Sequence, residues 1–168
     1  CWSALNDPRR CPVGITLLRT GSPYSENKTG RMVVIDLNAK FPPVVSAYMQ
    51  SDARHRFILG PFGSGKSVGS QWELPRRASM QRPSSVDGKR KTRFAVVRNT
   101  MPQLRDTTMK TFFDWFPNGS LGTYKETGKT YFIKQGDIEC EVIFRALDDA
   151  ADVKNLLSLE LTGAYINE

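Results

Sequence analysis

The segment Gly60-Pro-Phe-Gly-Ser-Gly-Lys-Ser67 limits the possible folds of this chain more than any other part of its sequence. It fits the pattern G-x-x-x-x-G-K-[ST] without a mismatch, and it follows an apolar stretch at 56–59 that predicts a short buried strand. A helix is expected to begin near Lys66. Glycines let the backbone turn successive N–H groups inward, and the positive end of the following helix also attracts an anion. The sequence therefore predicts a phosphate-binding loop between a strand and a helix.

The loop residues have distinct expected roles, with ATP and Mg²⁺ as the expected ligands. The backbone around the phosphates is expected to come from Gly60, Pro61, Phe62, Gly63, Ser64 and Gly65. Lys66 is expected to reach the β- and γ-phosphates, and the Ser67 hydroxyl to ligate Mg²⁺. The alternative is a glycine-rich turn that matches by chance, which average residue frequencies allow about once in a few hundred chains of this length.

The last residues of the chain predict a second part of this site. Ala164-Tyr-Ile166 reads as a short strand followed by Asn167 and Glu168. In P-loop ATPases, a strand beside the phosphate-loop strand carries an acidic residue on the metal side, with a Glu next to it. Asn167 stands where Asp is usual; its neutral amide can orient a metal-bound water but adds no charge to hold Mg²⁺. Glu168 is the candidate general base.

The positive charge of the chain is concentrated in one segment. The 168 residues carry a formal net charge of +7, and residues 76–98 alone contain eight Lys or Arg and one acid, Asp87. One interpretation is a patch that contacts DNA backbone or nucleotide phosphate; the other is an ordinary solvated loop. Arg98 and Arg105 flank a strand end and a helix start, where parallel α/β sheets bind ligands, although surface ion pairs would also explain them. The candidate contacts are Lys89, Arg90, Lys91, Arg98 and Arg105.

Several further elements are expected around these motifs. Pro75 is expected to end or kink the helix after the loop, and residues 94–98 predict a buried strand. A helix is expected over 100–116, with Thr100 as its cap and an apolar face that packs in the core. That face consists of Leu104, Met109, Phe112, Phe113 and Phe116.

The region after this helix predicts a hairpin and a capped helix. Residues 130–134 and 138–146 alternate apolar and polar side chains around Gln135-Gly136-Asp137. Asp148, Asp149 and Asp152 could suggest metal ligands, but capping of a helix that includes 153–157 is the simpler interpretation.

The remaining features limit the class of protein. Residues 1–31 are expected to form a leader that need not fold, which leaves 32–168 as the folded part. Cys1, Cys11 and Cys140 form no Cys-x-x-Cys pair, and His55 is the single histidine, so neither a zinc site nor a disulfide framework is expected and a reducing cytoplasm is the default. No apolar run approaches the ~18 residues of a membrane span.

Three segments in this order resemble one family. They are the loop at 60–67, the stretch Val97-Arg-Asn-Thr-Met-Pro-Gln-Leu-Arg-Asp-Thr107 and the ending Leu159-Glu-Leu-Thr-Gly-Ala-Tyr-Ile-Asn-Glu168. Together they look like the large terminase subunit of tailed bacteriophages, the motor that pumps DNA into a preformed capsid. The resemblance covers about residues 32–168. Many NTPases share the first segment, whereas the second and third are more specific.

The resemblance implies an α/β P-loop ATPase domain of the RecA-like, catalytic-Glu type, in which a mainly parallel sheet is flanked by helices. Its strands would lie near 57–59, 94–98 and 164–167 with the hairpin attached, and the domain would be incomplete at its end. Lys66 and Ser67 would be the Walker A pair. Asn167 would take the Walker B acid position, and Glu168 would be the catalytic carboxylate.

The resemblance also implies partners and a location. ATP hydrolysis would drive double-stranded viral DNA into the procapsid, with the portal protein, the small terminase subunit and further copies of the chain in a ring as partners. The location would be the host cytoplasm and, transiently, the procapsid portal. The family's nuclease activity is not expected of this segment. The alternatives are another P-loop NTPase, such as a helicase or a small-molecule kinase, and a fragment that binds nucleotide without turnover.

Overall fold

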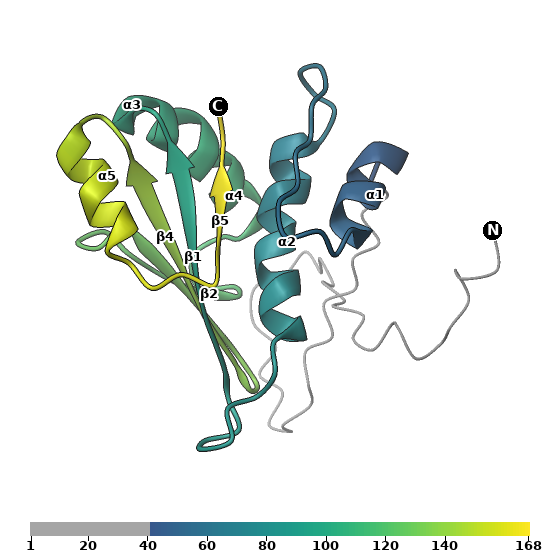
Figure 1. Ribbon diagram of the computed structural model, residues 1–168, viewed down its shortest axis with the longest axis vertical. Helices are drawn as coiled ribbons and strands as arrows, with labels where there is room; N and C mark the ends of the chain where they lie inside the picture. Colours follow the sequence, from purple (N-terminus) through teal and green to yellow (C-terminus); the bar gives the residue numbers. More distant parts are fainter. Residues whose placement is uncertain (1–40) are drawn as a thin grey trace. The chain divides into compact units, whose positions relative to one another are not determined.

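The computed structural model describes residues 41–168 (Figure 1). The predicted leader at 1–31 lies outside these residues. The helices are α1 (Pro43–Gln50), α2 (Lys66–Met80), α3 (Met101–Gln103), the π-helix η2 (Leu104–Met109), α4 (Lys110–Trp115) and α5 (Ala150–Leu157). The strands are β1 (Arg90–Arg98), β2 (Gly122–Lys125), β3 (Thr130–Gln135), β4 (Ile138–Ala146) and β5 (Gly163–Ile166).

The strands form one mixed sheet in the order β2-β3-β4-β1-β5. β1 pairs in parallel with β4 on one side and with β5 on the other, whereas the pairs β2–β3 and β3–β4 are antiparallel. The α/β class is therefore confirmed, but the sheet is mixed rather than mainly parallel. The predicted hairpin is also present, and its second strand, β4, lies in the middle of the sheet because it pairs with β1 along nine residues.

Residues 57–59 do not form the predicted strand, so this part of the sequence interpretation is wrong. The side chains of Phe57 and Leu59 are 90% and 91% exposed, and the segment is extended chain without a ladder partner. β5 lies at the edge of the sheet, and among the described strands it pairs only with β1. A short apolar run becomes a buried strand only when a neighbouring strand satisfies its backbone.

Helix α2 continues through Pro75 to Met80, so the proline does not end it. Pro75 removes one N–H donor from the helix interior. Burial on both sides offsets this loss, because Trp72 and Leu74 precede the proline and Ala78 follows it, all in the core. Tertiary packing therefore decides the length of this helix.

The predicted helix over 100–116 is confirmed between Met101 and Trp115, with a π-helical turn in the middle. The Thr100 side chain accepts a hydrogen bond from the backbone N–H of Gln103, as expected of a cap. Leu104 and Met109 are both buried although they lie five residues apart. An α-helix does not place such residues on one face, whereas a π-helix, which joins residues five apart, brings them closer.

The aromatic face of this helix is core, as predicted. The Phe112 ring lies 5.2 Å from the rings of Phe144 and Tyr131, and Trp72 of α2 lies 4.6 Å from Phe116. Helices α2 and α4 thus cover one face of the sheet through aromatic contacts. Figure 1 shows α5 on the opposite side of the sheet from α2.

The acidic cluster after β4 caps helix α5, as predicted. The Asp149 side chain accepts a hydrogen bond from the backbone N–H of Asp152. The Asp152 side chain accepts one from the backbone N–H of Asp148. This reciprocal pattern satisfies backbone donors at the start of the helix. No helix within residues 41–168 has the length and apolar character needed to cross a membrane.

Candidate functional site

The predicted loop between residues 60 and 67 turns through two left-handed glycines. Gly63 has a φ of 74° and Gly65 a φ of 80°, a backbone conformation that other residues adopt only with strain. Gly65 is also the residue just before α2, which begins at Lys66 as predicted. The Ser64 hydroxyl donates to the Pro61 carbonyl at 2.8 Å and closes the turn. Glycine is therefore required here by the backbone path itself.

The Lys66 ammonium lies inside this loop. Its Nζ donates to the carbonyl oxygens of Gly60 and Pro61, at 2.5 Å and 2.6 Å, and to the Ser64 hydroxyl at 3.1 Å. The residues from Gly60 to Gly63 are exposed, so the cation is held at the surface. This arrangement places one fixed positive charge and the positive end of α2 at the same point, where an anion is favoured.

A buried carboxylate anchors the chain that enters the loop. The side chain of Glu73, on α2, is 4% exposed, and its carboxylate accepts hydrogen bonds from Arg56 and Arg77 at 2.6 Å each. Arg76 Nε lies 3.3 Å from the same carboxylate. Arg56 lies four residues before Gly60. The cluster therefore links the extended segment that precedes the loop to α2, the helix that follows the loop. No motif in the sequence marks Glu73, and its burial follows from the packing of α2.

Strand β5 lies beside the first turn of α2. The Tyr165 phenol lies close to the Ser67 hydroxyl, and burial holds the pKa of Tyr165 above its ordinary value. Side chains alternate along a strand, so Tyr165 and Asn167 share the half-buried face toward α2, while Glu168 is exposed. The structure therefore brings the Ser67 end of the loop and the Asn167 end of β5 to one edge of the sheet.

A polar cluster, not foreseen from the sequence, connects these elements. Thr108 is buried in the π-helix. Its hydroxyl oxygen accepts hydrogen bonds from Asn167 Nδ2 at 3.0 Å and from Arg98 Nη1 at 3.4 Å. Its backbone carbonyl accepts from Gln71 Nε2 of α2 at 2.9 Å. Arg98 Nη1 also donates to the Thr107 hydroxyl at 2.9 Å. The one sequence signal for this cluster is the five-residue interval between Leu104 and Met109 that breaks the α-helical period.

Most candidate basic contacts already have acidic partners. The pairs are Lys89–Glu139 at 2.5 Å, Arg90–Asp137 at 3.3 Å, Lys91–Asp87 and Arg105–Glu126 at 3.6 Å. The Lys91 ammonium holds the pKa of the Asp87 carboxyl at about 2. Among the ion pairs within residues 41–168, none involves Arg98. The ion pairs favour the solvated-surface interpretation for the others, and contact with DNA stays a prediction.

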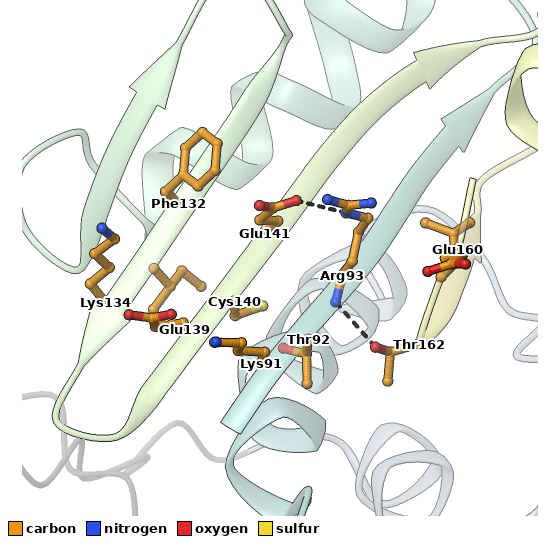
Figure 2. Close-up of a pocket in the computed structure, with 12 residues that line it drawn as sticks. Lys91, Thr92, Arg93, Phe132, Lys134, Glu139, Cys140, Glu141, Glu160 and Thr162 are labelled. Atoms are coloured by element: carbon orange, nitrogen blue, oxygen red, sulfur yellow. Dashed lines mark hydrogen bonds and ion pairs between the residues drawn. The ribbon is translucent and has the colours of Figure 1, made fainter. Parts of the chain in front are cut away.

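An open groove of about 910 Å³ on the sheet includes none of the loop residues. It is lined by the first halves of β1 and β4, by β3 and by the residues before β5. Figure 2 shows Arg93 directed at Glu141, and these two side chains pair at 2.7 Å. The backbone N–H of Arg93 also bonds to the Thr162 hydroxyl. The groove is therefore a solvated part of the sheet whose central charges are mutually satisfied.

The side chains at the loop edge of the sheet fit a hard cation. Ser67 offers a hydroxyl oxygen and Asn167 an amide oxygen, and Mg²⁺ prefers oxygen ligands with several waters. No group of three His, Cys, Asp or Glu side chains within residues 41–168 is arranged to hold a metal by itself. A cation here would consequently depend on phosphate oxygens as well as on this chain.

Comparisons with family models, curated proteins and solved structures find no match to this chain.

Proposed function

We propose that this chain is the ATP-hydrolysing segment of a DNA-packaging motor similar to the large terminase subunit of tailed bacteriophages. The observation that carries the proposal is the pair of hydrogen bonds that Thr108 accepts from Asn167, after β5, and from Gln71 of α2. These bonds bring the residues that follow β5 to the helix into which the left-handed glycines of the loop directly lead. A phosphate loop, a metal-side residue and a carboxylate are the parts that ATP hydrolysis needs.

The residues would divide the chemistry as follows. The loop backbone and Lys66 bind the β- and γ-phosphates, and Lys66 exchanges the Gly60 and Pro61 carbonyls for phosphate oxygens. Ser67 would hold Mg²⁺ and Asn167 would orient a water beside it, and a cation held there would neutralise charge on the phosphates. Glu168 accepts a proton from the water that attacks the γ-phosphorus, as the bond to the bridging oxygen breaks and ADP and phosphate form.

Two substitutions test binding and hydrolysis separately. Lys66→Ala removes charged hydrogen bonds and is expected to weaken the binding of a fluorescent ATP analogue about tenfold to a hundredfold. Glu168→Gln is expected to bind the analogue like the parent but to lose turnover, measured as phosphate release. Lys110→Ala, which removes an exposed lysine on α4, is the matched control and should behave as the parent. Turnover by Glu168→Gln at the parent rate would show that Glu168 is not the base.

Turnover with and without double-stranded DNA tests the motor part of the proposal. Phosphate release that rises with added duplex supports a packaging ATPase. Strand separation of the duplex would indicate a helicase instead, and analogue binding without any phosphate release would indicate a nucleotide-binding segment. Failure of the parent chain to bind the analogue at all would refute the proposal.

A further inference from the structure

We infer that Thr108 is the positioning residue for Asn167, an inference that rests on the proposed function. Its hydroxyl holds the Asn167 side chain by the amide nitrogen, at 3.0 Å, so that the amide oxygen remains available to a metal-bound water. Thr108 makes its side-chain hydrogen bonds to Asn167 and Arg98 and not to the loop residues. Its effect on the site would pass through Asn167.

Thr108 is a rigid support because it is held from α2. The residue is 1% exposed, and its backbone carbonyl accepts from Gln71 at 2.9 Å. Gln71 is fully buried on the helix that begins at Lys66. The loop helix thus fixes the threonine that in turn contacts the end of β5. A shift of α2 when phosphates bind would move Thr108 and Asn167 together.

Two donors share the Thr108 hydroxyl oxygen. The Thr108 oxygen has two acceptor sites, and Arg98 and Asn167 both donate to it. A guanidinium can only donate, so Arg98 always uses one of these sites. The Asn167 amide nitrogen uses the other site.

The π-helical turn supplies the geometry. Thr108 lies within Leu104–Met109, whereas the flanking residues are α-helical. π-turns shift the side chains that follow them and are frequent at functional sites. Here the turn places two consecutive hydroxyls, Thr107 and Thr108, against Arg98. Only the second of them also reaches Asn167, which provides a matched pair for the experiment.

The test compares affinity for a fluorescent, non-hydrolysable ATP analogue in Mg²⁺ and in EDTA. Thr108→Val, which removes the hydroxyl, is expected to weaken binding about fivefold in Mg²⁺, the loss of one hydrogen bond, and to leave binding in EDTA unchanged. Thr108→Ser, which keeps the hydroxyl, and Thr107→Val, which removes only the neighbouring one, should both bind like the parent. In an Asn167→Ala background, Thr108→Val should have no further effect.

A second measurement needs neither a variant nor a ligand. In the parent chain, NMR should show slower solvent exchange of the Asn167 side-chain amide protons than of those of exposed Asn155. Equal exchange would overturn the inference, as would a Thr108→Val effect that is the same in EDTA or that persists without Asn167. Parent-like binding by Thr108→Val would overturn it too. If the parent bound no analogue, the proposed function would fail, a result distinct from these.

Discussion

Glu73→Gln is the substitution that most directly tests how the loop is held. The change keeps the size of the side chain but removes a buried negative charge from the centre of three guanidinium groups. Arg56 and Arg77 lose charged hydrogen bonds of 2.6 Å, and the amide that replaces the carboxylate brings two donors of its own into a cluster made of donors.

The expected magnitude follows from burial. Removal of one partner from a buried ion pair costs about 3–5 kcal/mol, because the remaining charges stay desolvated without compensation. The side chains of the three arginines are 17–23% exposed and Glu73 is 4% exposed, so water can replace little of the lost interaction. For a domain of this size, such a loss lowers the melting temperature by roughly 10–20 °C.

Thermal unfolding followed by circular dichroism measures this loss. The control is Glu139→Gln, which removes a carboxylate from the Lys89 pair, whose side chains are 45% and 31% exposed. An exposed pair contributes about 1 kcal/mol or less, so the control should melt within a few degrees of the parent. A Glu73→Gln variant that melted with the control would refute the anchoring role of this cluster.

Three further predictions concern the core. Gly69→Ala should destabilise the fold by about 1–3 kcal/mol in urea unfolding, because a β-carbon there would lie 2.3 Å from Val45 Cγ1 of α1. Phe112→Ala should cost about 3–5 kcal/mol by the same assay, since its ring is fully buried among other rings. Burial raises the pKa of the Cys140 thiol from 9.0 to about 11, so the thiol of the unfolded chain ionises at a lower pH than that of the folded chain. The free energy of unfolding should therefore fall as the pH rises from 9 to 11, by up to about 3 kcal/mol. Cys140→Ala should show a smaller fall over the same range, and an identical pH profile would contradict this assignment.

Local sequence signals were reliable where a few neighbouring residues make the structure. Thr100 and Asp149 cap helices because a short side chain can reach an N–H three residues ahead. The hairpin turn was predictable because Gly136, with a φ of 56°, supplies a conformation that few residues tolerate. The start of α2 at Lys66 belongs to the same class, since Gly65 ends the preceding turn.

Signals that depend on distant partners failed or were silent. The apolar run around Phe57 resembles a buried strand, yet a strand exists only where another strand pairs with it. Pro75 resembles a helix end, yet packing on both sides carries α2 past it. The basic segment gives no sign of its ion-pair partners, because the acids that pair with Lys89 and Arg90 lie on β4 and in the turn before it, about fifty residues later in the chain.

The loop, its glycines and the start of the helix that follows can therefore be predicted from the residues alone, because these depend on local backbone geometry. Which side chains come near this loop depends on how the distant parts of the chain pack. Thr108 reaches Asn167, and Tyr165 comes close to Ser67, because β5 pairs with β1 and lies under the helix that contains the π-turn. Contacts between residues about sixty or more positions apart depend on the whole sheet, and no local pattern encodes them.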